Sequence, residues 1–439
     1  MLLRLIAENI LSFKDATEFN TFPSSKSPSH DNHRIECGHA TVLRMSAIYG
    51  ANGAGKSNLL MVLNFLQSIV QNETLNNIGF YDNGVFKLDL ECKNKPSGIA
   101  IEFCYNENVF YYHIEFSNKE IISETLLLSH KHKDVELFSR KGAEISIKHK
   151  YFGKGISEQF KDALQRLVRP DMLLLSFLGK YYPNESPIVA DAYQWFIGKL
   201  RIVLPDYAYG FVPHLLDTNE EFAKLMNDTL PELNTGIHQL KVKKKIITDK
   251  NVTDEQTKFF YKWAKEHPGE PKSVFIADDE INIIYEDGNV IAKSLVAVHK
   301  NIDGAEIDIS FPNESDGTRR LIEYMPLLYD TIQKDRVYVV DEIERSLHPI
   351  MIKDIIRKIS ESENAKGQLI FTTHESCLLD QSIFRPDEIW FAQKDVEQAT
   401  QLYPLSDFNI HKTANIENGY LDGRYGGIPF LSNLKDLNW

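Results

Sequence analysis

The sequence lacks any long apolar run and any recognisable export signal. A membrane-spanning helix needs about 20 apolar residues in succession, and the chain contains no such stretch. Its beginning, MLLRLIAENI, carries Arg4 and Glu8 and has no small-residue cleavage site of the kind found in signal peptides. We therefore expect no membrane association and a cytoplasmic location.

Cysteine is also scarce, and its spacing is uninformative. The four cysteines are scattered and include no Cys-x-x-Cys pair; they are Cys37, Cys92, Cys104 and Cys377. Paired spacing is typical of zinc sites and of disulfide frameworks. The sequence therefore supports neither kind of site, and it fits a reducing compartment.

Basic charge is in deficit. The chain has 49 Lys and Arg against 62 Asp and Glu, a formal net charge of −13, which excludes whole-surface attraction to nucleic acid while leaving room for a local basic patch. No long heptad run is present, so an extended coiled-coil arm is not expected. With 439 residues, of which 43% are hydrophobic, the chain has the size and composition of an ordinary globular protein of two or three lobes.

The most informative stretch runs from Ser46 to Asn58, SAIYGANGAGKSN. A short apolar run predicts a buried strand, a Gly-x-x-x-x-Gly-Lys-Ser loop follows, and helical spacing of apolar residues begins at Leu59. Glycines let the backbone N–H groups of such a loop surround a triphosphate, and the helix N-terminus adds further donors. The pattern therefore predicts nucleotide binding by Gly50, Asn52, Gly53, Ala54, Gly55, Lys56, Ser57 and Asn58.

Two residues of this loop have individual roles. Lys56 can reach the β- and γ-phosphates, and the Ser57 hydroxyl can ligate Mg²⁺. The predicted ligand and cofactor are thus ATP and Mg²⁺.

A second small-residue loop stands near position 315. Ser315-Asp-Gly-Thr318 opens a new helical pattern, so Ser315, Gly317 and Thr318 are candidates for binding a γ-phosphate at a helix N-terminus. Taken alone, four such residues are more often an ordinary helix cap.

Two further strands end in residues suited to phosphate chemistry. The apolar run Arg336-Val-Tyr-Val-Val is followed by Asp341 and Glu342; in a phosphate-loop protein the first would hold Mg²⁺ and the second would polarise the attacking water. The run Gln368-Leu-Ile-Phe-Thr-Thr precedes His374, which is then placed to contact the γ-phosphate. The predicted catalytic residues are Lys56, Glu342 and His374.

The middle of the chain carries less specific signals. Alternating residues between Val85 and Leu128 predict an antiparallel sheet with a hairpin turn at Tyr105–Asn108. Residues 157–233 look mostly helical, and strand patterns return at Ile237–Thr248 and Ser273–Ile309. The one dense basic cluster is Lys241-Val-Lys-Lys-Lys245. It has two interpretations, a solvated edge strand protected by lysines or a contact with a nucleic-acid backbone.

In this order, the motifs resemble those of the ABC-type ATPases of the RecF, SMC and OLD-nuclease branch. Glu342-Ile-Glu-Arg-Ser-Leu-His-Pro349 looks like the D-loop of this group, Ser315–Thr318 its signature loop and His374 its switch histidine. Asp316 departs from the glycine usual in the wider superfamily, and neither Gln67 nor Gln71 makes a convincing Q-loop residue. The start LIAENILSF, the segment VFKLD and the stretch Asp387–Lys394 are similar to bacterial AAA-family ATPases linked to abortive infection and phage defence.

The resemblance implies a two-lobed α/β ATPase head with an antiparallel β subsheet and a mostly helical inserted domain. The expected parts are residues 1–150 with the phosphate loop, 151–300 as the insertion, and 301–439 with the signature loop, Asp341–Glu342 and His374. Two heads would sandwich two ATP molecules, so that Ser315 and Gly317 of one subunit close the phosphate loop of the other.

Two functions remain open at this point. The first is a homo-oligomeric defence ATPase, a dimer or larger, that controls a separately encoded effector such as a nuclease. The second is a DNA-maintenance ATPase that clamps DNA in the manner of RecF or SMC heads. A self-contained OLD-type nuclease is disfavoured, because the stretch after His374 lacks the acidic strand-end pattern of a Toprim domain.

Overall fold

The protein is described from a computed structural model that covers residues 1–25, 27, 29–75, 84–152, 158–205, 210–233, 235–248, 255–276, 279–411 and 414–428. The chain divides into two compact units. Unit 1 comprises Met1–Pro205, Thr331–Glu344 and Lys353–Trp439, and unit 2 comprises Asp206–Asp330 and Arg345–Ile352. Within the described residues, no helix has both the length and the apolar character that crossing a membrane would require.

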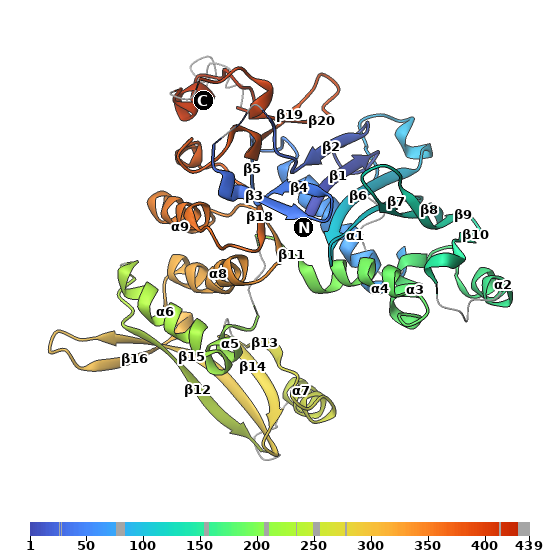
Figure 1. Cartoon of the computed structure of the whole chain (residues 1–439). Helices are drawn as coiled ribbons and strands as arrows, with labels where there is room; N and C mark the ends of the chain where they lie inside the picture. Colours follow the sequence, from blue (N-terminus) through green and yellow to red (C-terminus); the bar gives the residue numbers. More distant parts are fainter. Residues whose placement is uncertain are drawn as a thin grey trace. The chain divides into compact units, whose positions relative to one another are not determined.

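The centre of unit 1 is a six-stranded sheet (Figure 1). Its order is β11 (Leu200–Val203), β17 (Val337–Val340), β18 (Gln368–Thr372), β5 (Met45–Gly50), β19 (Ile389–Lys394) and β20 (Thr400–Pro404). The first five strands are parallel, and β20 pairs antiparallel with β19. Strands β5, β17 and β18 are buried along their whole length, as expected for the continuous apolar runs of a parallel sheet.

A seven-stranded antiparallel sheet lies beside it in the same unit. The order is β10 (Glu144–Ile147), β9 (Val135–Lys141), β8 (Ile121–Ser129), β7 (Asn108–Phe116), β6 (Ser97–Tyr105), β1 (Leu2–Glu8) and β2 (Thr17–Asn20). The predicted β6–β7 hairpin is confirmed, with its turn at Asn106 and Glu107. Helix α1 (Lys56–Asn72) contacts both β5 and β1, so its apolar side chains join the two sheets into one core.

Among the described residues, further helices and a small hairpin belong to the same unit. Strands β3 (Arg34–Cys37) and β4 (Ala40–Leu43) form the hairpin. The helices are α2 (Glu158–Leu167), α3 (Leu174–Tyr181), α4 (Pro187–Gln194) and α10 (Ile416–Leu421). Helices α8 (Asp316–Gln333) and α9 (Pro349–Glu361) each contribute residues to both units.

A fully buried polar cluster holds the chain around His33. The two ring nitrogens of His33 lie 2.8 Å from Glu388 Oε1 and 3.0 Å from Ser360 Oγ. Ser360 donates its hydroxyl to the Ile383 carbonyl oxygen at 2.8 Å. His33 and Glu388 are wholly buried and Ser360 is 1% exposed, so this Ser–His–Glu arrangement is structural rather than accessible to a substrate.

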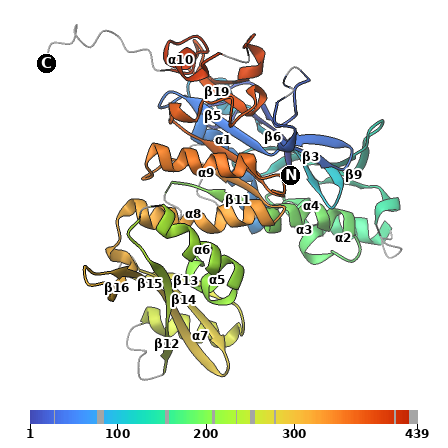
Figure 2. The same cartoon turned by 60° about the vertical axis from the view of Figure 1, so that its left-hand side comes forward.

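Unit 2 is an antiparallel sheet covered by helices on both faces (Figure 2). Its strands are β12 (Gln239–Ile247), β15 (Asn289–Lys300), β14 (Asp279–Glu286) and β13 (Lys272–Ile276), with β16 (Glu306–Ser310) paired to β15. Helix α5 (Val212–Thr218) donates its His214 N–H to Asn282, whereas Ala264 of α7 (Glu255–Glu266) packs on Ile283. Because neighbouring strand residues point to opposite faces, α5 and α7 cover opposite sides. Helix α6 (Glu220–Glu232) contacts β12.

The boundaries of the units differ from the expected 150/151 and 300/301. Residues 158–203, expected in the insertion, belong to unit 1, because α3 and α4 pack into its core through Leu174, Leu178 and Val189. The inserted unit also contains more sheet than expected. The strand patterns predicted at Ile237–Thr248 and Ser273–Ile309 are present and form its centre.

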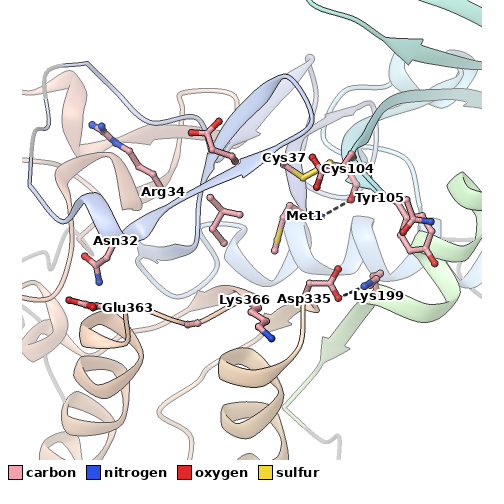
Figure 3. Close-up of a pocket in the computed structure, with 15 residues that line it drawn as sticks. Met1, Asn32, Arg34, Cys37, Cys104, Tyr105, Lys199, Asp335, Glu363 and Lys366 are labelled. Carbon is pink, nitrogen blue, oxygen red and sulfur yellow. Dashed lines mark hydrogen bonds and ion pairs between the residues drawn. A yellow bond between two sulfur atoms is a disulfide. The ribbon is translucent and has the colours of Figure 1, made fainter.

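The structure contains a disulfide, which the cysteine spacing did not support. Cys37 on β3 and Cys104 on β6 are joined by a disulfide, shown in Figure 3. Sequence spacing could not reveal this, because the two strands approach each other only in the folded unit. The bond lies at a cavity of about 550 Å³ lined in part by Arg34, Tyr105 and Lys199.

We expect this disulfide to stabilise unit 1. It spans 67 positions, and closing a loop of that size removes unfolded-state entropy worth about 4 kcal/mol in the chain-entropy model. The double variant Cys37→Ser/Cys104→Ser should therefore melt at a lower temperature than wild type in non-reducing buffer, and a reducing agent should narrow the gap. Cys377→Ser, which removes a cysteine outside the disulfide, is the control. Equal melting temperatures of double variant and wild type in non-reducing buffer would contradict the expectation.

Candidate functional site

The predicted phosphate loop connects β5 to α1. Gly50 ends the strand, α1 begins at Lys56, and Gly55 precedes it in a left-handed conformation with φ 106°. A Cβ added to Gly55 would lie 2.1 Å from Thr400 Oγ1, and one added to Gly50 would lie 2.5 Å from the Ala392 carbonyl oxygen. Both glycines are therefore required by close approach of the backbone, which leaves the loop wrapped tightly at the start of the helix.

This loop presents backbone donors to an anion. No side chain caps the N-terminus of α1, so its first N–H groups and the positive end of the helix dipole are directed at the loop. Asn52 and Gly53 are exposed and Asn58 is half-buried. The predicted strand, loop and helix are thus present in the geometry that phosphate binding requires.

Lys56 lies folded across the loop. Its ammonium donates to the carbonyl oxygens of Gly50 at 2.8 Å and Ala51 at 3.3 Å, and the residue is only 5% exposed. Burial lowers the pKa of Lys56 to about 8, although the nearby carboxylate of Asp341 partly opposes this shift. The side chain is thus held beside the place where phosphate would bind, with its charge only partly compensated.

Ser57 and Asp341 meet beside Lys56. Asp341 directly follows β17 and is 3% exposed, and its Oδ1 accepts the Ser57 hydroxyl at 3.1 Å. Two adjacent oxygen ligands of octahedral Mg²⁺ are about 3.0 Å apart, since each lies about 2.1 Å from the ion. The two oxygens therefore fit neighbouring positions of a Mg²⁺ ion.

Glu342 and His374 lie at the ends of neighbouring strands. Glu342 has φ 50°, a left-handed conformation that is uncommon for residues other than glycine, and its N–H donates to Thr372 Oγ1 at 2.8 Å. The His374 N–H donates to Glu344 Oε1 at 2.7 Å. Partial desolvation and the nearby Lys56 charge lower the pKa of His374, so its imidazole is neutral at pH 7.

The second predicted loop belongs to unit 2. Ser315 Oγ accepts the Thr318 N–H at 3.2 Å and lies 2.8 Å from the Thr318 hydroxyl, so it caps α8. A Cβ added to Gly317 would lie 2.7 Å from the Ser346 carbonyl oxygen. The start of α8 in unit 2 therefore has Ser315 exposed and Gly317 and Thr318 half-buried. Unit 1 brings together the other predicted residues, Lys56, Asp341, Glu342 and His374.

Sequence reasoning missed three residues around this site. They are Thr372, which accepts from the Glu342 N–H, Glu344, which accepts from the His374 N–H, and Thr400. Thr400 Oγ1 donates to the Ala54 carbonyl oxygen of the phosphate loop at 2.9 Å. Thr372 and Glu344 lie close to predicted strand ends, so their positions in the sequence could have marked them as candidate site residues. No local pattern marks Thr400, because β20 is brought beside the phosphate loop only by its pairing with β19 in the folded sheet.

Gln67, considered above as a Q-loop residue, has a structural contact instead. It is buried and donates to the Phe196 carbonyl oxygen at 2.7 Å.

The lysine cluster proves to be partly neutralised. Strand β12 is an edge of its sheet, Lys241 pairs with Glu306 at 2.8 Å and Lys244 pairs with Asp217 at 2.6 Å. These ion pairs favour the interpretation of a protected edge strand over that of a dedicated phosphate-binding surface.

The fold and this constellation define a phosphate-loop nucleotide-binding domain. The chain belongs to the family described as "AAA domain, putative AbiEii toxin, Type IV TA system", whose model matches residues 45–380. A search of curated proteins gave no match.

Solved structures similar to this chain include heads of SMC proteins. The SMC head domain from Thermotoga maritima is 12% identical, with a TM-score of 0.38 and coverage of 93% of this chain and 99% of that one. An SMC head bound to the C-terminal winged-helix domain of ScpA is 14% identical, with a TM-score of 0.41 and coverage of 92% and 97%. A head with an extended coiled coil, bound to the C-terminal domain of ScpA and derived from Pyrococcus furiosus, gives 14% identity, a TM-score of 0.38 and coverage of 92% and 96%.

The lowered pKa of Lys56 predicts that nucleotide affinity depends on pH. Phosphate binds the protonated amine, and the free protein loses this proton as pH rises through about 8. Above that pH the Kd for ATP should rise by about tenfold per pH unit, because binding then requires uptake of a proton. Calorimetric titrations at pH 7 to 9.5, in buffers of differing ionisation enthalpy, measure both the affinity and the proton uptake. A Kd that stays constant over this range would refute the assignment.

Proposed function

We propose that the protein is a Mg²⁺-dependent ATPase whose active sites form between two subunits. The observation that carries the proposal is the convergence of Ser57, Asp341 and Glu342 beside Lys56. Ser315 of the predicted signature loop is exposed at the start of α8 in the other unit. With Ser315 exposed and the positive end of the helix dipole behind it, the start of α8 is suited to complete a phosphate site supplied by a second copy. The proposed assembly is a homodimer with two shared ATP sites.

In this mechanism each residue has a defined task. Lys56 exchanges its carbonyl contacts for the β- and γ-phosphate oxygens, and Glu342 accepts a proton from the attacking water. His374, as a neutral imidazole, hydrogen-bonds a γ-phosphate oxygen. Ser57 and Asp341 would hold Mg²⁺, which when bound would supply positive charge to the phosphates.

For the biological role, we propose a cytoplasmic regulator in an anti-phage, abortive-infection system that controls a separate effector such as a nuclease. The family description, which names a toxin of a type IV toxin–antitoxin system, supports this role. A head that clamps DNA is the alternative, and the pairing of Lys241 and Lys244 with carboxylates makes it the weaker one. Copurification from the native host, followed by mass spectrometry, tests the choice: a stoichiometric protein partner supports the regulator, and DNA without one supports the clamp.

The variant Glu342→Gln should separate binding from hydrolysis. It removes the proton acceptor but preserves the shape of the side chain, so hydrolysis should slow by about two orders of magnitude or more while ATP stays bound. Light scattering with and without ATP should then detect an accumulated dimer. Identical masses in both conditions would argue against the shared site.

The variant Ser315→Arg should block closure without affecting nucleotide binding. Ser315 is preferred to Gly317 for this test, because a side chain at 317 would collide with the Ser346 carbonyl oxygen in the turn before α9 of the same subunit. The bulky arginine should abolish hydrolysis with the Kd for ATP unchanged within about threefold, since in the shared-site arrangement the loop serves the partner's nucleotide. Ser315→Ala, which removes the same hydroxyl without adding bulk, is the matched control for the size of the arginine and should cost about 1 kcal/mol of stability through loss of the helix cap.

Mixing Ser315→Arg with Lys56→Ala protein tests the same arrangement more directly. A mixed dimer contains one site with both an intact Lys56 and an intact Ser315. Random pairing in a two-fold dimer therefore allows recovery of up to about a quarter of the wild-type rate. If Ser315→Arg instead loses ATP binding as fully as Lys56→Ala, the signature loop belongs to its own subunit's pocket.

A further inference from the structure

Thr372 occupies the strand between the two that carry the nucleotide-binding residues. It is the last residue of β18, which pairs with β17 on one side and β5 on the other. Its side chain is fully buried. Asp341 and Glu342 follow β17 and the phosphate loop follows β5, so a hydroxyl at this point lies at the centre of the edge where the three strands end.

The hydroxyl of Thr372 makes two hydrogen bonds of defined direction. The Glu342 backbone N–H donates to Thr372 Oγ1 at 2.8 Å. Thr372 Oγ1 in turn donates its proton to Asp341 Oδ1 at 2.5 Å. A hydroxyl has one proton to give and lone pairs that accept, so both bonds form at once.

These two bonds constrain the Asp341 carboxylate and the backbone of Glu342, both of which have a role in the proposed ATP hydrolysis. Asp341 Oδ1 also accepts from Ser57, so Thr372 orients the same carboxylate that would hold the metal. Glu342 is in a left-handed conformation, which is disfavoured for a residue with a Cβ and persists only where surrounding contacts hold it. The bond to its N–H is such a contact, and the backbone conformation sets the direction of the Glu342 side chain.

We propose that Thr372 is a positioning residue for ATP hydrolysis, coupling the metal-binding carboxylate of Asp341 to the backbone that aims Glu342. This inference rests on the proposed function and adds a residue to it. Thr372 does not touch the substrate. Its hydroxyl fixes two acidic groups relative to each other, so that a shift of Asp341 on metal binding is transmitted to Glu342 through one oxygen atom.

The substitution Thr372→Val isolates the hydroxyl. Valine keeps the branched shape that suits a buried strand, and the backbone bond from the Ile343 N–H to the residue 372 carbonyl oxygen, 3.1 Å long, does not depend on the side chain. Thr372→Ser restores the hydroxyl without the methyl group. Thr373→Val is the matched control, because Thr373 is equally buried and its hydroxyl accepts from the Glu375 N–H at 3.0 Å, away from the two carboxylates.

The expected result is a split between binding and turnover. Removing a side chain that orients a metal ligand lowers metal affinity or activity by about 10-fold to 100-fold. Thr372→Val should therefore reduce kcat and raise the Mg²⁺ concentration for half-maximal activity within that range, while the Kd for ATP without Mg²⁺ stays at the wild-type value. Thr372→Ser should recover most of the loss, and Thr373→Val should resemble wild type.

Two outcomes would overturn the inference. One is a Thr372→Val enzyme with wild-type kcat and Mg²⁺ dependence. The other is an equal loss in Thr372→Val and Thr373→Val, accompanied by equal falls in melting temperature, which would mark the hydroxyl as merely structural.

The test remains informative if the wild-type protein hydrolyses no ATP, an outcome that would defeat the proposed function itself. The gain in ATP affinity on adding Mg²⁺ can still be measured by calorimetry, without turnover. A smaller gain in Thr372→Val than in Thr373→Val would support the positioning of Asp341, and an equal gain in both would overturn it.

Discussion

The candidate site depends on three buried parallel strands that end at the same edge of one sheet. Parallel pairing fixes β5, β18 and β17 in register, so the residues that follow them must lie together however distant they are in the chain. This constraint brings the hydroxyl groups of Ser57 and Thr372 within hydrogen-bonding distance of the Asp341 carboxylate. Both faces of such a sheet are covered, which explains why Asp341 and Thr372 are buried.

The parts of the site that could be predicted from sequence are those attached to strand ends. Lys56, Ser57, Asp341, Glu342 and His374 each follow an apolar run within a few residues, and a local pattern therefore reveals them. The conformation of Glu342 and the contact of Thr400 with the phosphate loop depend on pairing between distant strands, so no local pattern reports them.

The same distinction explains the fold. The apolar and alternating runs predicted β5, β6, β7 and α1, because their periodicity reflects their own burial. The unit boundaries were harder, since the helices before residue 200 have the same composition whether they pack into unit 1 or stand in an insertion. Leu174 and Val189 place these helices in unit 1, because they pack in its core with residues far away in the chain. The spacing of apolar residues within a helix does not indicate such distant contacts. Pairing of Cys37 with Cys104 was invisible for the same reason.

That disulfide has a topological consequence for the nucleotide-binding segment. Because it joins residues 37 and 104, it closes a covalent ring that contains β5, the phosphate loop and the whole of α1. A single break of the backbone anywhere within this ring leaves the two fragments attached to each other as long as the bond is oxidised. The element that binds phosphate thus stays tethered at both ends, through peptide bonds on one path and through sulfur on the other.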